Sequence, residues 1–283
     1  MIFKNFPIYH LNGCITPTSI FLKDNGKSIK IPKGTIIDED IIKLLKINEI
    51  FKLSCIKLNQ NEIFENEAAS KISKNLISNK LDLFSARNFS TGRSNIISKH
   101  DGIFHYDEKQ LIKINSITNL VGIGAIKPFS KVIKGQNLIT IKIMPYGISE
   151  RLVSKIIKYV KNCFKLSTFK RLKVHLIQTF HDQTKINHLD KIKLITEERV
   201  KNCGNRISNE FRSLHDETSL NKIFTKSIKS NPNLILIFGI NAINDTRDLI
   251  PKVIKNNNGK ILRFGMPVEP GNLILLSSII KNK

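Results

Sequence analysis

Tryptophan is absent from this chain of 283 residues, and only 7% of its residues are aromatic. Aromatic rings are the platforms on which single-stranded nucleic acids stack, so the composition offers few contacts of that kind. Cysteine is also scarce, and the four copies are widely separated: Cys14, Cys55, Cys163 and Cys203. With no CxxC pair and no Cys/His cluster, the sequence indicates neither a zinc site nor a disulfide framework. Buried thiols in a reducing compartment are the expectation.

Long hydrophobic runs are missing as well. The longest apolar runs, such as 234–240, have about the length of a strand, whereas a membrane-spanning helix needs about 20 apolar residues. The first 22 residues are interrupted by Pro7, His10, Asn12 and Gly13 and contain no secretory hydrophobic region. We therefore expect a cytoplasmic protein with no membrane partner.

Acidic residues are few: 23 Asp and Glu stand against 46 Lys and Arg, which gives a formal net charge of +23. Such a charge invites binding to nucleic acid. Lysine is nevertheless spread along the whole chain, and the densest basic stretch, 165–173, leads directly into an apolar segment. A generally basic surface that attracts small anions is the favoured interpretation. A non-enzymatic basic module that binds nucleic acid or an acidic protein is the alternative.

The hydrophobic content of 41% is enough to form the cores of two modest domains. In the first half, short strands at 20–22 and 28–31 flank the turn Asp24-Asn25-Gly26, and Asp38 is placed to cap a helix. Strands at 121–126 and 138–144 are joined through Pro128 and a turn at 134–136, and helical periodicity runs over 150–164. The segment 165–167 is interpreted as a hinge, which predicts a β-rich α+β domain over 1–166 and a second domain over 167–283.

The second half alternates strands and helices. The expected strands are 172–177, 207–214, 234–238, 260–264 and 273–276, and the expected helices are 186–202, 217–229 and 248–255. The strand at 234–238 is entirely apolar, and we expect it to be fully buried. Strands separated by helices predict an α/β fold with a mostly parallel sheet covered on both faces, in three layers. Ligands of such sheets bind beyond the carboxyl ends of the strands.

Three loops at those strand ends are rich in polar groups. Gln178 and Thr179 follow the first strand, His215 to Thr218 follow the second, and the third leads into 238–248. Gly239 lets backbone amides approach a ligand, and a helix that begins near Asp248 favours the binding of an anion in this loop. Asp216 and Asp248 are candidates to hold a metal or orient a nucleophile. Asp216 is equally suited to capping its helix, and Asp248 to pairing with Arg247. His181 and His188, seven residues apart, are interpreted as surface residues of one helix face rather than as a metal site.

Two motifs stand out in the second half: the loop from Phe238-Gly239 to Asp248-Leu-Ile-Pro251 and the run Arg263-Phe-Gly-Met-Pro-Val-Glu-Pro-Gly-Asn-Leu273. Both resemble the molybdopterin-binding domain of molybdenum-cofactor biosynthesis proteins. The likeness is to the bacterial type that occurs alone or joined to a cytidylyltransferase domain. Further similar segments are 65–69, 92–95, 138–145 and 189–192, so the resemblance covers nearly the whole chain.

The resemblance implies a molybdopterin site in the strand-end loops. The residues matching the family's cofactor-binding positions are Thr179, Gly239, Asn241, Arg247, Pro270 and Gly271. Asp216 and Asp248 match aspartates important in relatives that adenylylate molybdopterin or insert molybdenum. The resemblance also implies that Asp248 is a ligand of Mg²⁺. The implied partners are the pterin and a cofactor-accepting or nucleotidyltransferase protein, and a homo-oligomer is conceivable. Glu65, Glu67, Arg93 and Asn95 are further candidates to line the site.

One departure from the family concerns the C-terminus. The family continues after its last strand with a Gly-x-Pro-Gly loop and a closing helix, whereas here Ser277-Ser278-Ile279-Ile280 leads to Lys283. The resemblance therefore implies a C-terminally incomplete domain, with an apolar sheet face left open or covered by a partner. Whether the chain is an enzyme or a binding protein stays open at this point.

Overall fold

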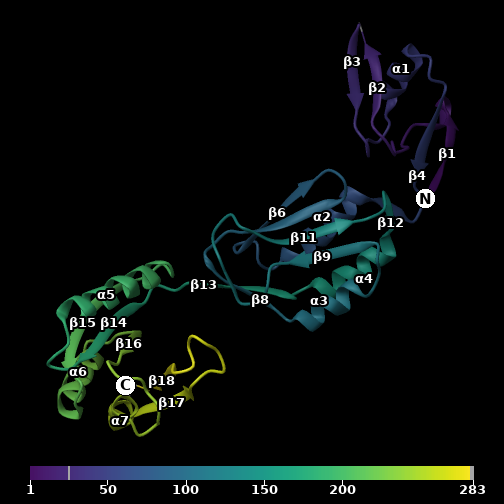
Figure 1. Cartoon of the computed structure of the whole chain (residues 1–283). Helices are drawn as coiled ribbons and strands as arrows, with labels where there is room; N and C mark the ends of the chain where they lie inside the picture. Colours follow the sequence, from purple (N-terminus) through teal and green to yellow (C-terminus); the bar gives the residue numbers. More distant parts are fainter. Residues whose placement is uncertain (25, 281–283) are drawn as a thin grey trace. The chain divides into compact units, whose positions relative to one another are not determined.

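The computed structural model describes residues 1–24 and 26–280, and it has a mixed α/β fold made of two compact units, Met1–Thr168 and Phe169–Lys283 (Figure 1). Asn25, the centre of the predicted turn at 24–26, lies outside the described residues. Among the described helices, none is long and apolar enough to cross a membrane.

The first unit begins with a small core of its own. Strands β1 (Ile2–Pro7) and β4 (Lys52–Lys57) pair antiparallel, and β2 (Ile20–Asp24) and β3 (Lys27–Ile31) form the predicted hairpin. A 3₁₀ turn spans Ile8–His10. Helix α1 (Glu39–Ile47) starts where the sequence predicts, because the Asp38 carboxylate accepts a hydrogen bond of 2.9 Å from the Ile41 N–H.

A second and larger core fills the rest of the first unit. Its helices are α2 (Glu65–Ile77), α3 (Glu108–Asn115) and α4 (Glu150–Val160). Its strands are β5 (Glu62–Phe64), β6 (Phe84–Phe89), β7 (Arg93–Ser98), β8 (Gly102–Tyr106), β9 (Val121–Ala125), β10 (Ser130–Val132), β11 (Asn137–Ile143), β12 (Gly147–Ser149) and β13 (Phe164–Thr168). They form antiparallel sheets in the orders β6-β7-β11-β9, β10-β8-β13 and β12-β5.

The boundary between the two units falls between Thr168 and Phe169, two residues after the predicted boundary, but the predicted hinge at 165–167 is a strand. These residues lie inside β13, which pairs antiparallel with β8 through Leu166 and Phe104. Phe164, expected to end a helix, is the first residue of this strand and is 1% exposed. Phe164 and Leu166 are buried while Lys165 between them is exposed, so the period is that of a strand.

The second unit is built on β14 (Lys173–Phe180), which pairs in parallel with β15 (Arg206–Leu214) on one side and β16 (Leu234–Phe238) on the other. Its helices α5 (Ile186–Lys201), α6 (Glu217–Lys229) and α7 (Leu249–Asn256) follow these strands in alternation. Gly204, with a φ of 71°, follows the end of α5 as predicted.

The last two strands, β17 (Gly259–Phe264) and β18 (Leu275–Ile279), form a separate antiparallel pair. The final strand therefore starts two residues later than predicted, because the residues from Gly265 to Ile274 are joined by their own turn hydrogen bonds. The expected full burial of β16 is also wrong, since Leu234 is 39% exposed and the strand's other residues are only partly buried.

The core of the second unit lies on one face of the parallel sheet. Ile177 on β14 and Leu220 and Phe224 on α6 are each at most 2% exposed, and they pack with Ile250 and Val253 of α7. Helices α6 and α7 pack on this face, and α5 packs against β15. Because β14, β15 and β16 run parallel, their carboxyl ends meet at one edge of the sheet.

Candidate functional site

The register of the parallel sheet aligns the three strand ends. Thr179 on β14 lies opposite Ser213 on β15, and its neighbour Gln178 lies opposite Phe238 at the end of β16. The loops that begin at Phe180, Leu214 and Phe238 therefore leave the sheet at nearly the same level. This is the edge at which ligands of parallel sheets bind.

Thr179 connects the loop after β15 and the loop after β16 through hydrogen bonds of its side chain. Its side chain is buried, and its Oγ1 accepts a hydrogen bond of 2.9 Å from the Ile240 N–H. The same oxygen lies 2.8 Å from Nδ1 of His215. A threonine hydroxyl has one proton to donate, which goes to His215 when that ring is neutral and carries its own proton on Nε2. Thr179 thus fixes both the loop after β16 and the orientation of His215.

The surroundings of His215 favour the neutral form of its side chain. Burial lowers the pKa of His215 below its usual value, the nearby His181 lowers it further, and Asp216 partly opposes the change. The two imidazole rings meet edge to face with centroids 5.4 Å apart. The His181 Nε2 is 3.4 Å from Oδ1 of Asn241, so His181 links the first loop to the third.

A pocket of about 560 Å³ opens above these contacts. His215, Asn241 and Asp248 line it, together with Ile240, residues 242–244 of the same loop, and Leu249 and Ile250 of α7. Its polar lining offers an imidazole, a side-chain amide and a carboxylate within one cavity. Such a set is suited to a small heterocycle with several hydrogen-bonding edges.

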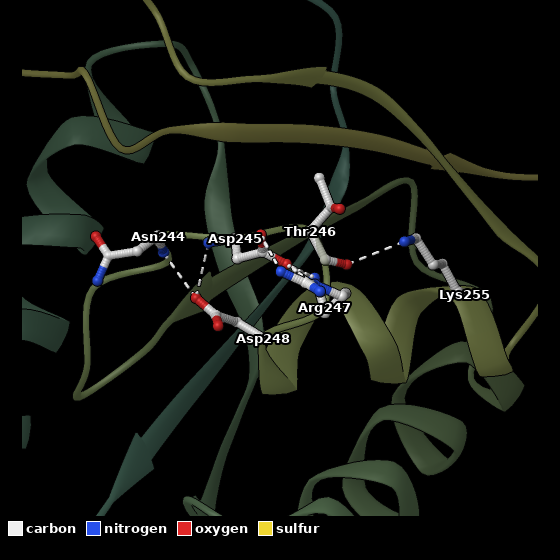
Figure 2. Close-up of polar contacts among 6 residues, drawn as sticks. All are labelled: Asn244, Asp245, Thr246, Arg247, Asp248 and Lys255. Carbon is white, nitrogen blue, oxygen red and sulfur yellow. Dashed lines mark hydrogen bonds and ion pairs between the residues drawn. The ribbon is translucent and has the colours of Figure 1, made fainter.

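Asp248 closes the loop that precedes α7 (Figure 2). Its Oδ2 accepts hydrogen bonds from the Asn244 N–H at 2.7 Å and the Asp245 N–H at 3.0 Å. The loop amides that the sequence suggested for a phosphate are therefore directed at a carboxylate of the chain itself. A phosphate reaches those amides only if Asp248 turns away.

Arg247 pairs with Asp245 rather than with Asp248, contrary to the alternative considered for Asp248. Its Nε is 2.8 Å from Oδ1 of Asp245, which also accepts the Arg247 backbone N–H. The Arg247 side chain is 88% exposed. This fork-shaped pair orients the guanidinium at the surface, so Arg247 meets a ligand phosphate only by exchanging its partner.

Gly239 sits where the loop turns over α7. A Cβ at this position would lie 2.8 Å from Cδ1 of Ile250 and 2.9 Å from the carbonyl oxygen of Asn241. The second contact is with backbone, so a larger residue displaces the loop itself. Gly239 therefore serves the close packing of the loop that carries Asn241.

Asp216 has the capping role that the sequence offered as one of its two interpretations. It is the N-cap of α6, and its Oδ1 accepts a hydrogen bond of 2.8 Å from the Ser219 N–H. That hydrogen bond lowers the pKa of Asp216, whose side chain is at the surface. Asp216 adjoins His215 in sequence but does not line the pocket.

Pro270 and Gly271 lie apart from this group, in the exposed loop between β17 and β18. The Gly271 carbonyl accepts the Ile274 N–H, and the backbone of Gly271 has a φ of 123°, a conformation that favours glycine. Of the eight predicted site residues, the structure brings Asn241 and Asp248 to the pocket wall, with Thr179 and Gly239 directly supporting it.

No preformed metal site accompanies the pocket: within 1–24 and 26–280, no group of three His, Cys, Asp or Glu side chains is placed to hold an ion. The Asp248 carboxylate fits Mg²⁺ only as a single protein ligand, which is the usual situation when Mg²⁺ is held mainly by water and phosphate.

The four site candidates from the first unit, Glu65, Glu67, Arg93 and Asn95, contact neighbouring side chains of that unit. Glu65 is 4% exposed and lies 3.7 Å from Nζ of Lys142, and burial raises its pKa. Glu67 pairs with Lys71, Arg93 stacks on Phe89, and Asn95 accepts a hydrogen bond from Thr140. These contacts hold the residues within α2 and the β6-β7-β11-β9 sheet.

Sequence reasoning missed His181, which was assigned to a helix face with His188. The structure places His181 ahead of α5, because the His181 N–H donates to Oγ1 of Thr184 and forms a turn there. The signal was present in the sequence: the helix was predicted to begin at 186, which leaves His181 in the loop that follows the first strand, close to Gln178 and Thr179.

The fold and the pocket define the chain as a two-unit mixed α/β protein with a polar site at the ends of three parallel strands. No protein-family model matches the sequence, and no curated protein matches it. Among solved structures, the chain is similar to the molybdopterin biosynthesis MoeA protein from Pyrococcus horikosii, with a TM-score of 0.28 and 10% identity. That match covers 98% of this chain and 68% of the other chain.

Proposed function

We propose that the pocket above β14, β15 and β16 binds molybdopterin or its metal-loaded form, and that the protein acts in maturation or delivery of the molybdenum cofactor. The proposal combines the sequence motifs at 238–251 and 263–273 with one structural observation. Thr179, His215 and Ile240 tie the three strand-end loops into one polar pocket, in which Asn241 and Asp248 are exposed to a ligand.

The hydrogen-bonding groups of the pocket residues suit a pterin. A pterin presents alternating donors and acceptors along its ring edge, and the Asn241 amide and Asp248 carboxylate offer complementary groups. Burial lowers the pKa of His215, which favours its neutral form; with Nδ1 accepting from Thr179, that form would offer an N–H from Nε2 without placing a second charge in the pocket. Arg247, adjacent in sequence to Asp248, would supply positive charge for the terminal phosphate by exchanging its present partner, Asp245.

The finer fold assignment belongs to the same proposal. The second unit is proposed to be a three-layer molybdopterin-binding domain, in which β14, β15 and β16 form the central sheet and β17 and β18 extend the unit. In this arrangement, the loop carrying Pro270 and Gly271 contributes to ligand binding from outside the pocket described above.

If the protein is catalytic, the reaction class is adenylyl transfer to molybdopterin or insertion of molybdenum with loss of the nucleotide. Mg²⁺ would neutralise phosphate charge beside Asp248. The part of this chain's own residues is to orient the pterin through Asn241 and His215 and to position the negative charge of Asp248. The binding role stands without the catalytic one.

The experiment is a titration of the purified chain with molybdopterin, followed by pterin fluorescence, for wild type and Asp248→Asn. Asparagine keeps an acceptor for the Asn244 and Asp245 N–H groups while removing the charge, so the loop is expected to persist. We expect saturable micromolar binding by wild type and at least tenfold weaker binding by Asp248→Asn.

Glu198→Gln is the matched control, because Glu198 is an exposed carboxylate on α5 outside the pocket lining. Its affinity is expected to equal that of wild type. A folded wild-type chain that does not bind molybdopterin would refute the proposal, and equal binding by Asp248→Asn would remove Asp248 from the site.

A further inference from the structure

The face of the parallel sheet opposite α6 and α7 carries an apolar groove of about 370 Å³. Its floor is formed by Val174 of β14 and by Leu234, Leu236 and Phe238 of β16. One wall is the last turn and a half of α5, including Val200, and the groove extends to Cys203 beyond the helix. All of its lining residues belong to the second unit.

The alternation of side chains along β16 explains the groove. Ile235 and Ile237 point to the face covered by α6 and α7, where they pack in the core. Leu234, Leu236 and Phe238 point the other way. On that side α5 packs against β15, two strands away from β16, and Leu234 remains 39% exposed. Apolar side chains thus line a furrow between a helix and an edge strand.

The groove has a basic rim. Lys170 and Arg199 lie on its border, and Arg171 and Lys173 are exposed beside Lys170. Within the described residues, no carboxylate forms an ion pair with any of these four side chains. The surface therefore combines an apolar floor with uncompensated positive charge at one end.

We propose that this groove is a docking site for an acidic amphipathic helix of a partner protein. Parallel sheets are covered by helices on both faces, and a furrow between a helix and a strand accepts apolar side chains spaced at i, i+3, i+4 and i+7. Glutamates or aspartates on the flank of the incoming helix meet Lys170 and Arg199.

Charge also decides against a second copy of this chain as the occupant. The formal net charge is +23, so two copies repel each other, and the basic rim would meet another basic surface. An acidic partner is drawn to the same rim. This docking site is independent of the pterin pocket, because the two share no lining residue.

Cys203 supplies a chemical reporter of occupancy. It lines the groove and is partly exposed, whereas Cys14, Cys55 and Cys163 are buried. Burial raises the pKa of Cys55 to about 12 and that of Cys163 to about 11, which suppresses their thiolate forms. Iodoacetamide is therefore expected to modify Cys203 before the other three thiols of the native chain.

The test uses the full chain and two synthetic 18-residue amphipathic helices with the same leucine face, one flanked by glutamate and the other by lysine. We expect the acidic peptide to bind at least tenfold more tightly by fluorescence anisotropy, to lose affinity with added salt, and to slow iodoacetamide modification of Cys203 severalfold. Equal binding of both peptides, or binding that leaves Cys203 reactivity unchanged, would overturn the proposal.

Two variants locate the binding. Leu234→Asp places a charge on the groove floor at a position that is already partly exposed, and Arg199→Glu reverses the rim; each is expected to weaken acidic-peptide binding at least tenfold. Lys222→Glu, on the exposed surface of α6, is the matched charge reversal and should bind as wild type does. Concentration-dependent dimers that protect Cys203 without any peptide would assign the groove to a second copy instead.

Discussion

The two faces of the sheet in the second unit are covered differently, although the same strands form both. On the face toward α6 and α7, Leu220, Phe224 and Val253 are each at most 2% exposed. On the face toward α5, Leu234 of β16 is 39% exposed above an open groove. The first face carries the hydrophobic cluster of α6 and α7, whereas the second leaves apolar surface available for binding.

The largest expected effect is a difference in unfolding free energy between truncations on the two faces of the sheet. Phe224→Ala removes a ring that is 2% exposed, and we expect a loss of about 3–5 kcal/mol in the unfolding free energy of the second unit. Leu236→Ala in the groove should cost less than half as much, because its side chain has fewer neighbours to lose. Urea denaturation measures both. Equal losses would mean that the two faces are packed alike.

A smaller effect concerns the junction between the packed face and the pocket. Gly239→Ala introduces a Cβ against the Asn241 carbonyl and Ile250, so we expect destabilisation of about 1–3 kcal/mol. Displacement of the loop should weaken molybdopterin binding as well. Thermal unfolding and the pterin titration test the two effects, and a variant that matches wild type in both would show that the loop adapts freely.

Two substitutions at Asp248 are expected to affect the stability of the loop at 244–248 differently. Asp248→Ala removes the acceptor of the Asn244 and Asp245 N–H groups and is expected to cost about 1 kcal/mol, because the loop is partly exposed to water. Asp248→Asn keeps an acceptor and should cost less. Amide hydrogen exchange at residues 244 and 245 provides the measurement. Faster exchange in both variants alike would show that the negative charge, rather than an acceptor atom, holds the loop.

The pH dependence of the second unit is expected to be modest. His175, with its Nδ1 2.8 Å from Oγ of Ser227, is fully buried, and burial lowers its pKa and that of His215. Below about pH 6.5 the unfolded chain takes up protons that the folded chain resists, so stability falls as pH decreases from 7.5 to 5. His175→Gln should flatten this decrease. If the unfolding free energy rises on acidification, the lowered pKa values of His175 and His215 do not govern the pH dependence.

The sequence predicted the alternation in the second half because apolar periodicity and polar caps agree there. Asp216 at the start of α6 and Gly204 after α5 are examples. It also predicted that Thr179, Asn241 and Asp248 would gather, since parallel strands end at one edge of the sheet. These inferences depend only on local pattern and on the geometry common to such sheets.

Other features depended on long-range contacts that no local pattern contains. The segment 165–167 was interpreted as a hinge because its pairing partner, β8, lies about 60 residues earlier in the chain. The partial exposure of β16 was missed for a related reason: its sequence shows that the strand is apolar, but not which neighbours cover it. The pairing of Arg247 with Asp245 likewise depends on a turn whose geometry the sequence does not specify.

The central claim, a pterin site at the strand ends, is tested most directly by backbone amide NMR of the isotope-labelled chain during titration with molybdopterin. We expect saturable shifts confined to the strand-end loops, at residues 179–184, 214–217 and 239–248, with the β17–β18 loop responding more weakly. Shifts restricted to the first unit, or no shifts with excess molybdopterin present, would contradict the account.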